Sequence, residues 1–316
     1  MPAPLPPPEF SAAAAYPQVS AGRAALAAGD WPALRALLEE QDPHGRTFLV
    51  DDVGGTPDAG KFLHDVHTEH PEDPLAGTLL GAYLIGAGWR IRSAKRAQYV
   101  SQQQFAQFSD HLCRAEQVLI DVTARHPAEV TAWAQRITSA RGLEAGQAEA
   151  RRRYDRLAAH EPHHLAAQTQ LLQQLCPKWG GSWERAHAFV RECVEAVPPG
   201  APNAVLVVEA YLEQALHHGK ASVAGEFLRG QRARAEIHDA ARRSIWHPEF
   251  RHGWDWVSVR STFALAFALM QEWTPAAQQY AALGNLGSTW MYEHLGDGAK
   301  EFQRFRDKAY AKGGRP

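Results

Sequence analysis

The sequence predicts an all-α protein in which antiparallel helix pairs stack as a solenoid and extra helices follow at the C-terminus. Three observations favour this class. A pattern of small and apolar residues recurs at a nearly constant interval, the apolar spacing is helical over most of the chain, and Pro or Gly ends each helical run. The chain has 316 residues, 45% of them hydrophobic, which is enough to bury a sizeable core.

The recurring pattern occurs in three segments: AEQVLIDVTARHP at 115–127, ARRRYDRLAAHEP at 150–162 and AHAFVRECVEAVP at 186–198. Each has an alanine, an apolar or aromatic residue four positions later, another apolar residue three later, and a proline five after that. The residues are Ala115, Leu119, Val122 and Pro127, then Ala150, Tyr154, Leu157 and Pro162, then Ala186, Val190, Cys193 and Pro198.

The spacing of these residues has a direct physical meaning. Steps of four and three place the side chains on one helical face, and the alanine permits close approach of a neighbouring helix. The proline cannot continue the helix and begins the next unit. The segments start 35 and 36 residues apart, so the pattern resembles the second half of the tetratricopeptide repeat (TPR), whose period is about 34. An irregular helical domain is the alternative.

Weaker copies of the pattern flank these segments. AAGDWPALRALL at 27–38 has a Gly-x-aromatic turn between paired helices, and 263–283 repeats the helical spacing. Two segments, 89–105 and 244–259, interrupt the rhythm, and long insertions are often functional loops. We therefore predict a disordered Pro-rich tail at 1–12, N-terminal helices at 13–73, a TPR-like repeat core at 74–243, C-terminal helices at 244–311 and a tail at 312–316.

The net charge and the cysteine content argue against several classes of function. The net charge of −2 provides no overall attraction to nucleic acid or to an anionic membrane. Three cysteines, without a CxxC pattern, indicate neither a disulfide framework nor a zinc site. The first residues lack the basic segment of a signal peptide, and the longest apolar run, 263–270, is far shorter than a membrane span. We predict a cytoplasmic protein with no nucleic-acid or membrane partner.

Part of the chain is similar to a known family. The segments that carry the similarity are GWRIRSAKRAQYVSQQQFAQFSDHLCRAEQVL at 88–119, Trp133, and PKWGGSWERAHAFV at 177–190. Over 74–198 the chain resembles a bacterial family of TPR-like proteins known only as a domain of unknown function, and PKWGGS is its clearest mark. The family usually has Arg-Gly-Ser-Gly where RIRSAKR stands here. The resemblance implies a helical-repeat fold and supplies no activity.

The PKWGGS loop contains the first two candidate binding residues. Pro177 ends one helix, Gly180 and Gly181 allow a tight turn with positive φ, and Ser182 is placed to N-cap the next helix. Backbone geometry does not account for Lys178 and Trp179, so we take both as candidates for binding a carboxylate or an acidic peptide. The alternative is that Trp179 is wedged between helices while the Lys178 stem lies along apolar surface.

A second candidate segment is WHPEFRHGWDW at 246–256, from which we select Trp246, His247, His252 and Trp254 as ligand-binding residues. Aromatic and titratable side chains in one segment suit a ligand pocket. They equally suit an aromatic plug between helical layers, because Trp buries a large apolar area.

Other motifs favour ordinary structural roles. Gly55, Gly60 and Lys61 imitate a P-loop, but Phe62 replaces the magnesium-binding Ser or Thr, so we expect no nucleotide binding. His64, His67 and His70 recur at a spacing of three, which leaves open a metal site or a polar helix face. The basic stretch RRRYDR at 151–156 is expected to be a solvated helix face, and His163 and His164 to be capping and surface residues.

These observations favour an interaction scaffold that binds a protein or peptide ligand, with no catalytic residue and no cofactor assigned. The alternative is an enzyme or a small-molecule-binding protein that uses the His- and Trp-rich loops. A groove lined by apolar and charged side chains would favour the scaffold. A deep pocket in which Lys178, Trp179 and the 246–256 loop meet would favour the alternative.

Overall fold

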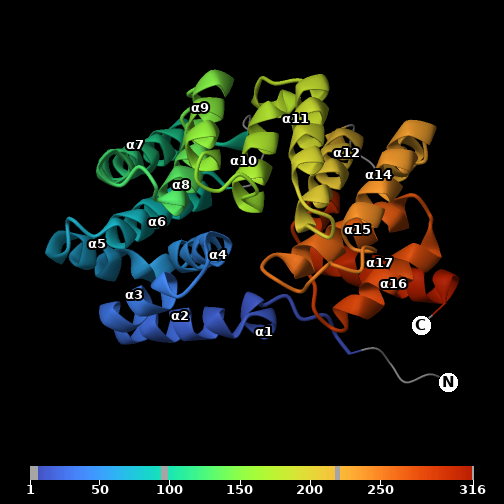
Figure 1. The fold of residues 1–316 in the computed structure, drawn as a ribbon, viewed down its shortest axis with the longest axis horizontal. Helices are drawn as coiled ribbons and strands as arrows, with labels where there is room; N and C mark the ends of the chain where they lie inside the picture. The colour runs from blue at the N-terminus through green and yellow to red at the C-terminus, as the bar shows by residue number, and fades with distance from the viewer. Residues whose placement is uncertain (1–5, 94–98, 218–220, 315–316) are drawn as a thin grey trace. The chain divides into compact units, whose positions relative to one another are not determined.

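The computed structural model describes residues 6–93, 99–217 and 221–314, and these residues are all-helical, with no strand among them (Figure 1). The predicted all-α class is therefore confirmed. Within the part of the chain that the structure describes, no helix combines the length and hydropathy that crossing a bilayer requires.

The chain divides into two compact units. The N-terminal unit comprises Tyr16–Gly181, and the C-terminal unit comprises Ser182–Pro316 with the segment up to Ala15. The division falls inside the predicted repeat core, within the PKWGGS loop.

Among the described residues, the N-terminal unit contains helices α2 to α10 and the short 3₁₀ helices η1 and η3. Their bounds are α2 (Pro17–Ala28), α3 (Trp31–Glu39), α4 (Pro43–Gly54), η1 (Pro57–Ala59), α5 (Gly60–Glu69), α6 (Pro74–Arg92), α7 (Gln102–Arg125), α8 (Val130–Gly142), α9 (Gln147–Ala158), α10 (Leu165–Leu175) and η3 (Pro177–Trp179).

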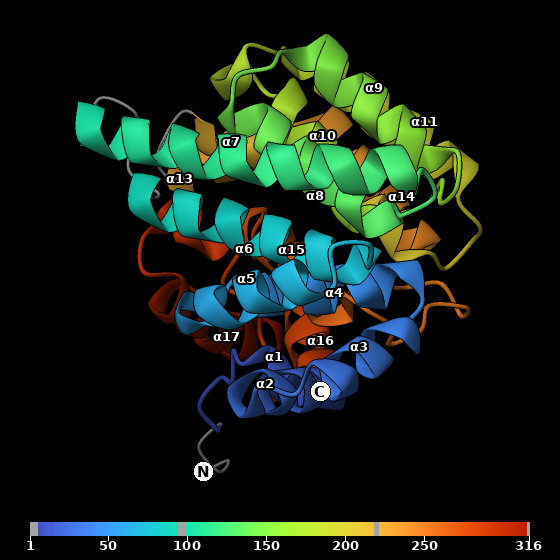
Figure 2. The same cartoon turned by 90° about the vertical axis from the view of Figure 1, so that its left-hand side faces the viewer.

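These helices alternate between two sets. Helices α2, α4, α6, α8 and α10 contact one another in succession, and α4 also reaches α8 and α10. Each of α3, α7 and α9 packs on both of its neighbours along the chain, and α5 packs on α6. Figure 2 shows α7 alongside α6 and α6 alongside α4. The N-terminal unit is thus a succession of helix pairs.

Glycines explain how closely α6 and α7 approach. A Cβ on Gly81 would lie 2.6 Å from the side chain of Leu119, and one on Gly77 would lie 2.5 Å from Val122. Leu119 and Val122 are the apolar residues of the first repeated segment. That segment therefore packs its predicted face against a groove that only glycine leaves open.

The repeated residues form the core, as the spacing predicted. All nine alanine and apolar positions of the three segments are buried. Tyr154 is 6% exposed, Val190 is 1% exposed, and Leu119 and Leu157 are fully buried. This result confirms the helical face that the sequence assigned to each segment.

Leu157→Ala should lower the free energy of unfolding by about 2–5 kcal/mol, because it removes apolar contacts and leaves a cavity in a close-packed helix interface. Denaturant unfolding followed by circular dichroism measures the change. A loss below about 0.5 kcal/mol, the range of ordinary surface substitutions, would contradict the burial of this side chain.

The C-terminal unit contains α1 (Ala12–Ala15), α11 (Trp183–Ala196), η4 (Pro202–Ala204), α12 (Val205–His217), α13 (Ala221–Leu228), α14 (Gln231–Arg243), α15 (Trp256–Leu269), α16 (Trp273–Leu283), η5 (Tyr292–Leu295) and α17 (Gly298–Gly313). Helix α12 is buried on nearly every side and contacts α11, α13, α14 and α15. Helices α15, α16 and α17 pack together. The additional C-terminal helices therefore have a core of their own.

The Pro-rich N-terminal segment has more defined structure than the sequence predicted. Residues 1–5 lie outside the described residues, whereas residues 6–12 are described and include several with defined contacts. Glu9 pairs with the 285–287 turn through two backbone hydrogen bonds, of 2.6 and 2.9 Å, and the Phe10 ring packs edge-on against Phe302. Arg306 also donates to the Pro6 carbonyl at 2.8 Å. The predicted disordered tail at 1–12 was too long, because its last residues find partners far along the sequence.

Candidate functional site

The PKWGGS backbone has the geometry that its residues predicted. Pro177 opens η3, Gly180 has a φ of +81°, and the Ser182 hydroxyl accepts the Arg185 backbone N–H at 3.2 Å as the N-cap of α11. Gly181 serves a different purpose, since a Cβ there would lie 1.9 Å from the Leu175 carbonyl oxygen. The two glycines thus provide one positive φ and one close approach.

Trp179 is half-buried in a cluster of aromatic rings and guanidinium groups. Its ring lies edge-on to Trp89, with 6.0 Å between ring centroids, and Arg141 lies over both rings at 5.4–5.6 Å. Arg92 lies 6.0 Å from the Trp179 ring. Trp89 and Arg92 belong to α6 and Arg141 to α8, so packing between helices accounts for Trp179. Lys178 is exposed beside it.

The candidates in the 246–256 loop pack mainly as aromatic surfaces. Trp246 stacks on Phe267 with 5.3 Å between centroids. His252 stacks on Trp256 at 3.9 Å, and desolvation, helped by Arg260, lowers its pKa. His247 accepts the Glu249 backbone N–H through Nδ1, and Trp254 is half-buried. Trp246 and His252 thus stack on different partners, and the aromatic-plug interpretation accounts for both.

Lys178 and Trp179 belong to the N-terminal unit, whereas Trp246, His247, His252 and Trp254 belong to the C-terminal unit. The two sets of candidate residues therefore belong to different units. A ligand that uses both sets at once remains a prediction.

His64 and His67 belong to α5, and His70 is the C-cap residue of that helix. Among the residues that the structure describes, no three His, Cys, Asp or Glu side chains come close enough together to hold a metal ion. Instead, His70 faces the Trp31 ring at 6.2 Å, and His67 is half-buried, which lowers its pKa.

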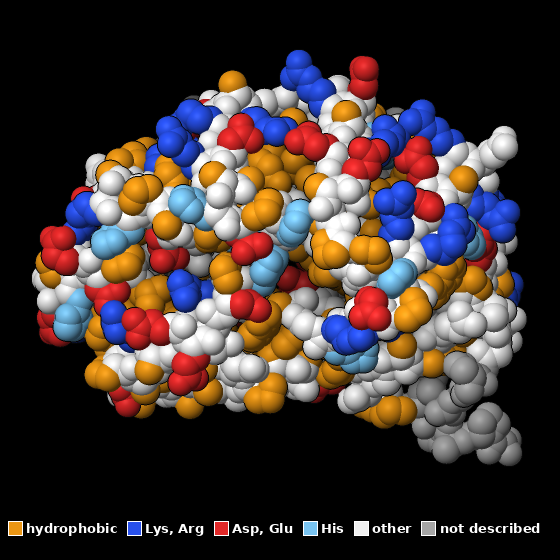
Figure 3. All heavy atoms as spheres, in the orientation of Figure 1, with side chains coloured by type: hydrophobic (Ala, Val, Ile, Leu, Met, Phe, Trp, Pro, Cys, Tyr) orange, Lys and Arg blue, Asp and Glu red, His pale blue; other side chains and the backbone are white. Residues whose placement is uncertain are grey.

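A groove that the sequence analysis did not identify lies between α3 and α5, with a volume of about 760 Å³. We call it the α3–α5 groove. Its apolar part includes Trp31, Pro32, Phe62 and Val66. Its polar part has four carboxylates and one guanidinium: Glu39, Asp65, Glu69, Asp73 and Arg35. The region over α3 and α5 in Figure 3 accordingly shows acidic side chains among hydrophobic ones.

The carboxylates of the α3–α5 groove differ in how far they are neutralised. Arg35 donates to Asp73 at 2.6 Å and to Glu39 at 2.9 Å, and Lys61 pairs with Asp65 at 2.5 Å. Glu69 is exposed and has no ion-pair partner among the described residues. One guanidinium serves two carboxylates, so the lining keeps a negative excess.

Local sequence sets the walls of this groove. Gly29 has a φ of +65°, and Asp30 N-caps α3 by accepting the Ala33 backbone N–H at 2.9 Å. This turn fixes the start of α3 at Trp31. On α5, Phe62, Asp65 and Glu69 follow steps of three and four, which places them along one face. The Gly-x-aromatic turn in the sequence indicated where α3 begins. Nothing in the sequence indicated that α5 forms the other side of the groove.

No family model, no curated protein and no solved structure matches the chain. The resemblance to the bacterial TPR-like family therefore stays a prediction.

Proposed function

We propose that the protein is a TPR-like helical-repeat scaffold that binds a peptide segment of another protein in the α3–α5 groove, and that this segment carries basic and apolar residues. The observation that carries the proposal is the groove itself, which combines aromatic walls with an excess of carboxylates. The proposed ligand has the opposite charge to the acidic peptide that the sequence predicts at Lys178. Lys178 belongs to the same unit but does not line the α3–α5 groove.

The succession of helix pairs in the N-terminal unit supports the scaffold class. Stacked helix pairs present extended grooves, and peptide binding is a common use of such surfaces. The repeated segments pack their Ala and apolar faces as the TPR spacing requires. Both features favour a TPR-like solenoid over an irregular helical domain.

The chemistry of the α3–α5 groove favours a ligand of definite composition. Lys or Arg side chains complement the carboxylates, and aliphatic side chains remove the apolar walls from water. The ring faces of Trp31 and Phe62 also attract cations. A volume of about 760 Å³ accommodates a few side chains of a bound segment rather than a whole domain.

Selection from a random peptide library on the full-length protein tests the proposal. We expect enrichment of peptides that combine Lys or Arg with aliphatic or aromatic residues. Glu69→Lys should weaken a selected peptide by roughly tenfold or more, since a like charge then faces the ligand. The weakening should shrink at high salt.

Glu40→Lys is the matched control, because Glu40 is an exposed residue that follows α3 and does not line the groove. It changes the net charge equally and should alter affinity by less than about twofold. Enrichment of acidic peptides, or equal weakening by Glu69→Lys and Glu40→Lys, would contradict binding in the groove.

A further inference from the structure

A second, smaller pocket lies in the N-terminal unit where α7, α8 and α9 meet, with a volume of about 270 Å³. It is lined by Thr123, Ala124, Pro127, Trp133, Arg152, Arg156, Ala159 and His160. Its charged lining is entirely basic, in contrast to the α3–α5 groove. This pocket plays no part in the peptide binding proposed above.

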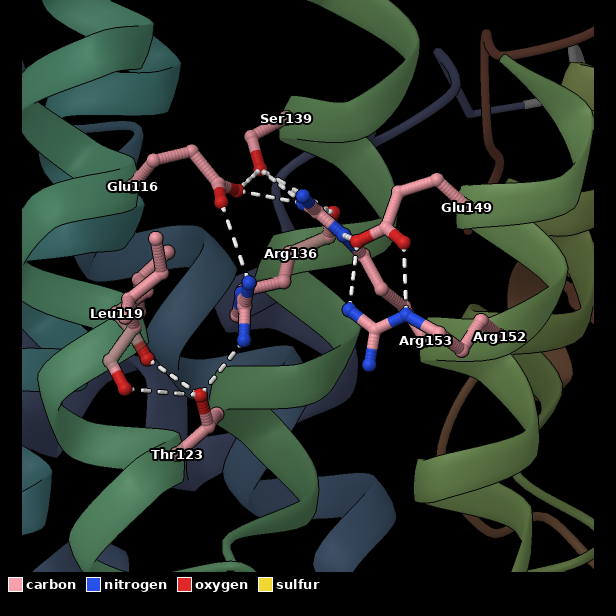
Figure 4. A network of polar contacts seen from close by, with 9 residues as sticks. Glu116, Leu119, Thr123, Arg136, Ser139, Glu149, Arg152 and Arg153 are labelled. Carbon is pink, nitrogen blue, oxygen red and sulfur yellow. Dashed lines mark hydrogen bonds and ion pairs between the residues drawn. The ribbon is translucent and has the colours of Figure 1, made fainter. Parts of the chain in front are cut away.

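A buried ion-pair network lies beside the pocket (Figure 4). Glu116 accepts hydrogen bonds from Arg153 Nη1 at 2.6 Å, from Arg136 Nη2 at 3.4 Å and from the Ser139 hydroxyl. Arg136 Nη1 also donates to the hydroxyl of Thr123, a lining residue, at 2.8 Å. The network therefore connects directly to the pocket wall.

A second carboxylate completes the network. Glu149 accepts from Arg152 and from Arg153, each at 2.7 Å, and the hydrogen bond from Arg152 is the main reason that its pKa falls to about 2. Glu149 is thus ionised at neutral pH and already shared between two guanidinium groups.

The charges around the pocket do not balance. Glu116 and Glu149 are the carboxylates of the network, and Arg136, Arg152 and Arg153 are its guanidinium groups. Arg156 lines the pocket as well and has no ion-pair partner among the described residues. The excess of two positive charges favours an anion at the pocket.

We propose that this pocket binds the phosphate group of a small phosphomonoester. A phosphate monoester carries a charge of about −1.5 to −2 at neutral pH, which matches the excess better than a single carboxylate does. Arg156 provides a whole guanidinium group, Arg152 provides Nη1 because Glu149 already binds its Nε and Nη2, and His160 belongs to the same lining. Guanidinium forks suit phosphate oxygens because they donate two parallel hydrogen bonds.

The apolar part of the lining suits the organic part of such an ester. Trp133 is nearly buried, and its indole N–H donates to the Pro127 carbonyl at 2.9 Å, which fixes the ring. The Arg136 guanidinium lies 4.9 Å from the ring centroid. The pocket thus has a rigid apolar wall and a basic wall, and its volume suits a phosphate with a small organic group.

The RRRYDR stretch consequently has more than one role, although the sequence suggested one solvated face. Arg151 pairs with Asp155 at the surface, and Arg153 is 6% exposed within the network. Arg152 and Arg156 lie at the pocket. Helical spacing of four brings these last two residues to one face of α9.

Calorimetric titration of the full-length protein with methyl phosphate, in a phosphate-free buffer, tests the proposal. We expect saturable binding at millimolar ligand, and inorganic phosphate should compete. Arg156→Gln should weaken binding by roughly tenfold, because it removes a charged donor. Arg156 is exposed, so the variant should fold normally, and His160→Gln provides a second exposed lining variant.

Arg114→Gln is the matched control, because Arg114 is an exposed residue of α7 outside the pocket lining. It should change the affinity by less than about twofold. Absence of methyl phosphate binding to the wild type would overturn the proposal. Equal weakening by Arg114→Gln and Arg156→Gln would also overturn it, and so would acetate binding as tightly as methyl phosphate.

Discussion

Glu116→Gln is expected to lower the free energy of unfolding by about 3–5 kcal/mol, the usual cost of removing one partner from a buried ion pair. Glu116 is 8% exposed, and its carboxylate binds the guanidinium groups of Arg136 and Arg153, residues that are 7% and 6% exposed. The amide keeps the size of the side chain but leaves Arg136 without a carboxylate partner and Arg153 with Glu149 alone. Urea unfolding at neutral pH, followed by circular dichroism, measures the loss.

Asp155→Asn is the control for this substitution. Asp155 pairs with Arg151 on the same unit, but the two side chains are 54% and 43% exposed, so water replaces the lost interaction. We expect a change below about 1 kcal/mol, as for other exposed pairs. A similar small loss for Glu116→Gln would contradict a network that depends on Glu116, and would indicate that water reaches the two guanidinium groups.

The sequence was informative about helices because helical spacing is a local property. Steps of three and four identified the buried faces of Leu119, Tyr154, Leu157 and Val190 without knowledge of what they contact. The turn chemistry of PKWGGS was similarly local, and the φ of Gly180 and the cap at Ser182 agree with it.

The candidate sites depend on contacts that no local pattern encodes. Trp31 and Phe62 both line the α3–α5 groove, and the buried ion-pair network joins Glu116 of α7 to Arg153 of α9. In the sequence, Glu116 is an ordinary polar residue beside Ala115. Only the packing of three helices shows that it lies among buried cations.

For His164, the sequence predicted the local role of the side chain but not its distant contacts. The sequence indicated a capping and surface residue. The cap is confirmed, because Nδ1 accepts the Ala167 backbone N–H at 3.2 Å. The surface position is wrong, because His164 is fully buried. Its ring stacks on His44 with 4.8 Å between centroids, a partner about 120 residues away in the chain.

The stability of the protein should decrease as the pH falls from about 6.5 to about 4, and His164 should contribute about 3 kcal/mol of this decrease. Desolvation, aided by the neighbouring His44, lowers the pKa of His164 from 6.5 to about 4. Between pH 6.5 and pH 4, the unfolded chain therefore binds a proton at His164 that the folded chain does not bind. The neutral ring stabilises the fold fully above pH 6.5, and this contribution is lost progressively down to pH 4.

The hydrogen bonds around His164 explain why the neutral ring is preferred. Nδ1 accepts the Ala167 N–H, so Nε2 carries the proton in the neutral ring and is placed to donate to the Thr47 hydroxyl at 3.0 Å. Protonation would turn Nδ1 into a donor that faces the N-terminus of α10. The cap would then be lost and a charge would be buried.

His164→Asn separates the effect of this group from any effect of the other ionisable side chains around it, which include Asp42, His44 and Glu161. Asn keeps an oxygen that can cap α10 and has no proton to gain. The variant should be less stable at pH 7, because Thr47 loses a partner, yet its stability should fall less steeply with acid, so the difference from wild type should shrink towards pH 4. Parallel acid profiles for wild type and His164→Asn would mean that the folded protein accommodates a protonated His164, against the capping geometry and the burial that keep this ring neutral.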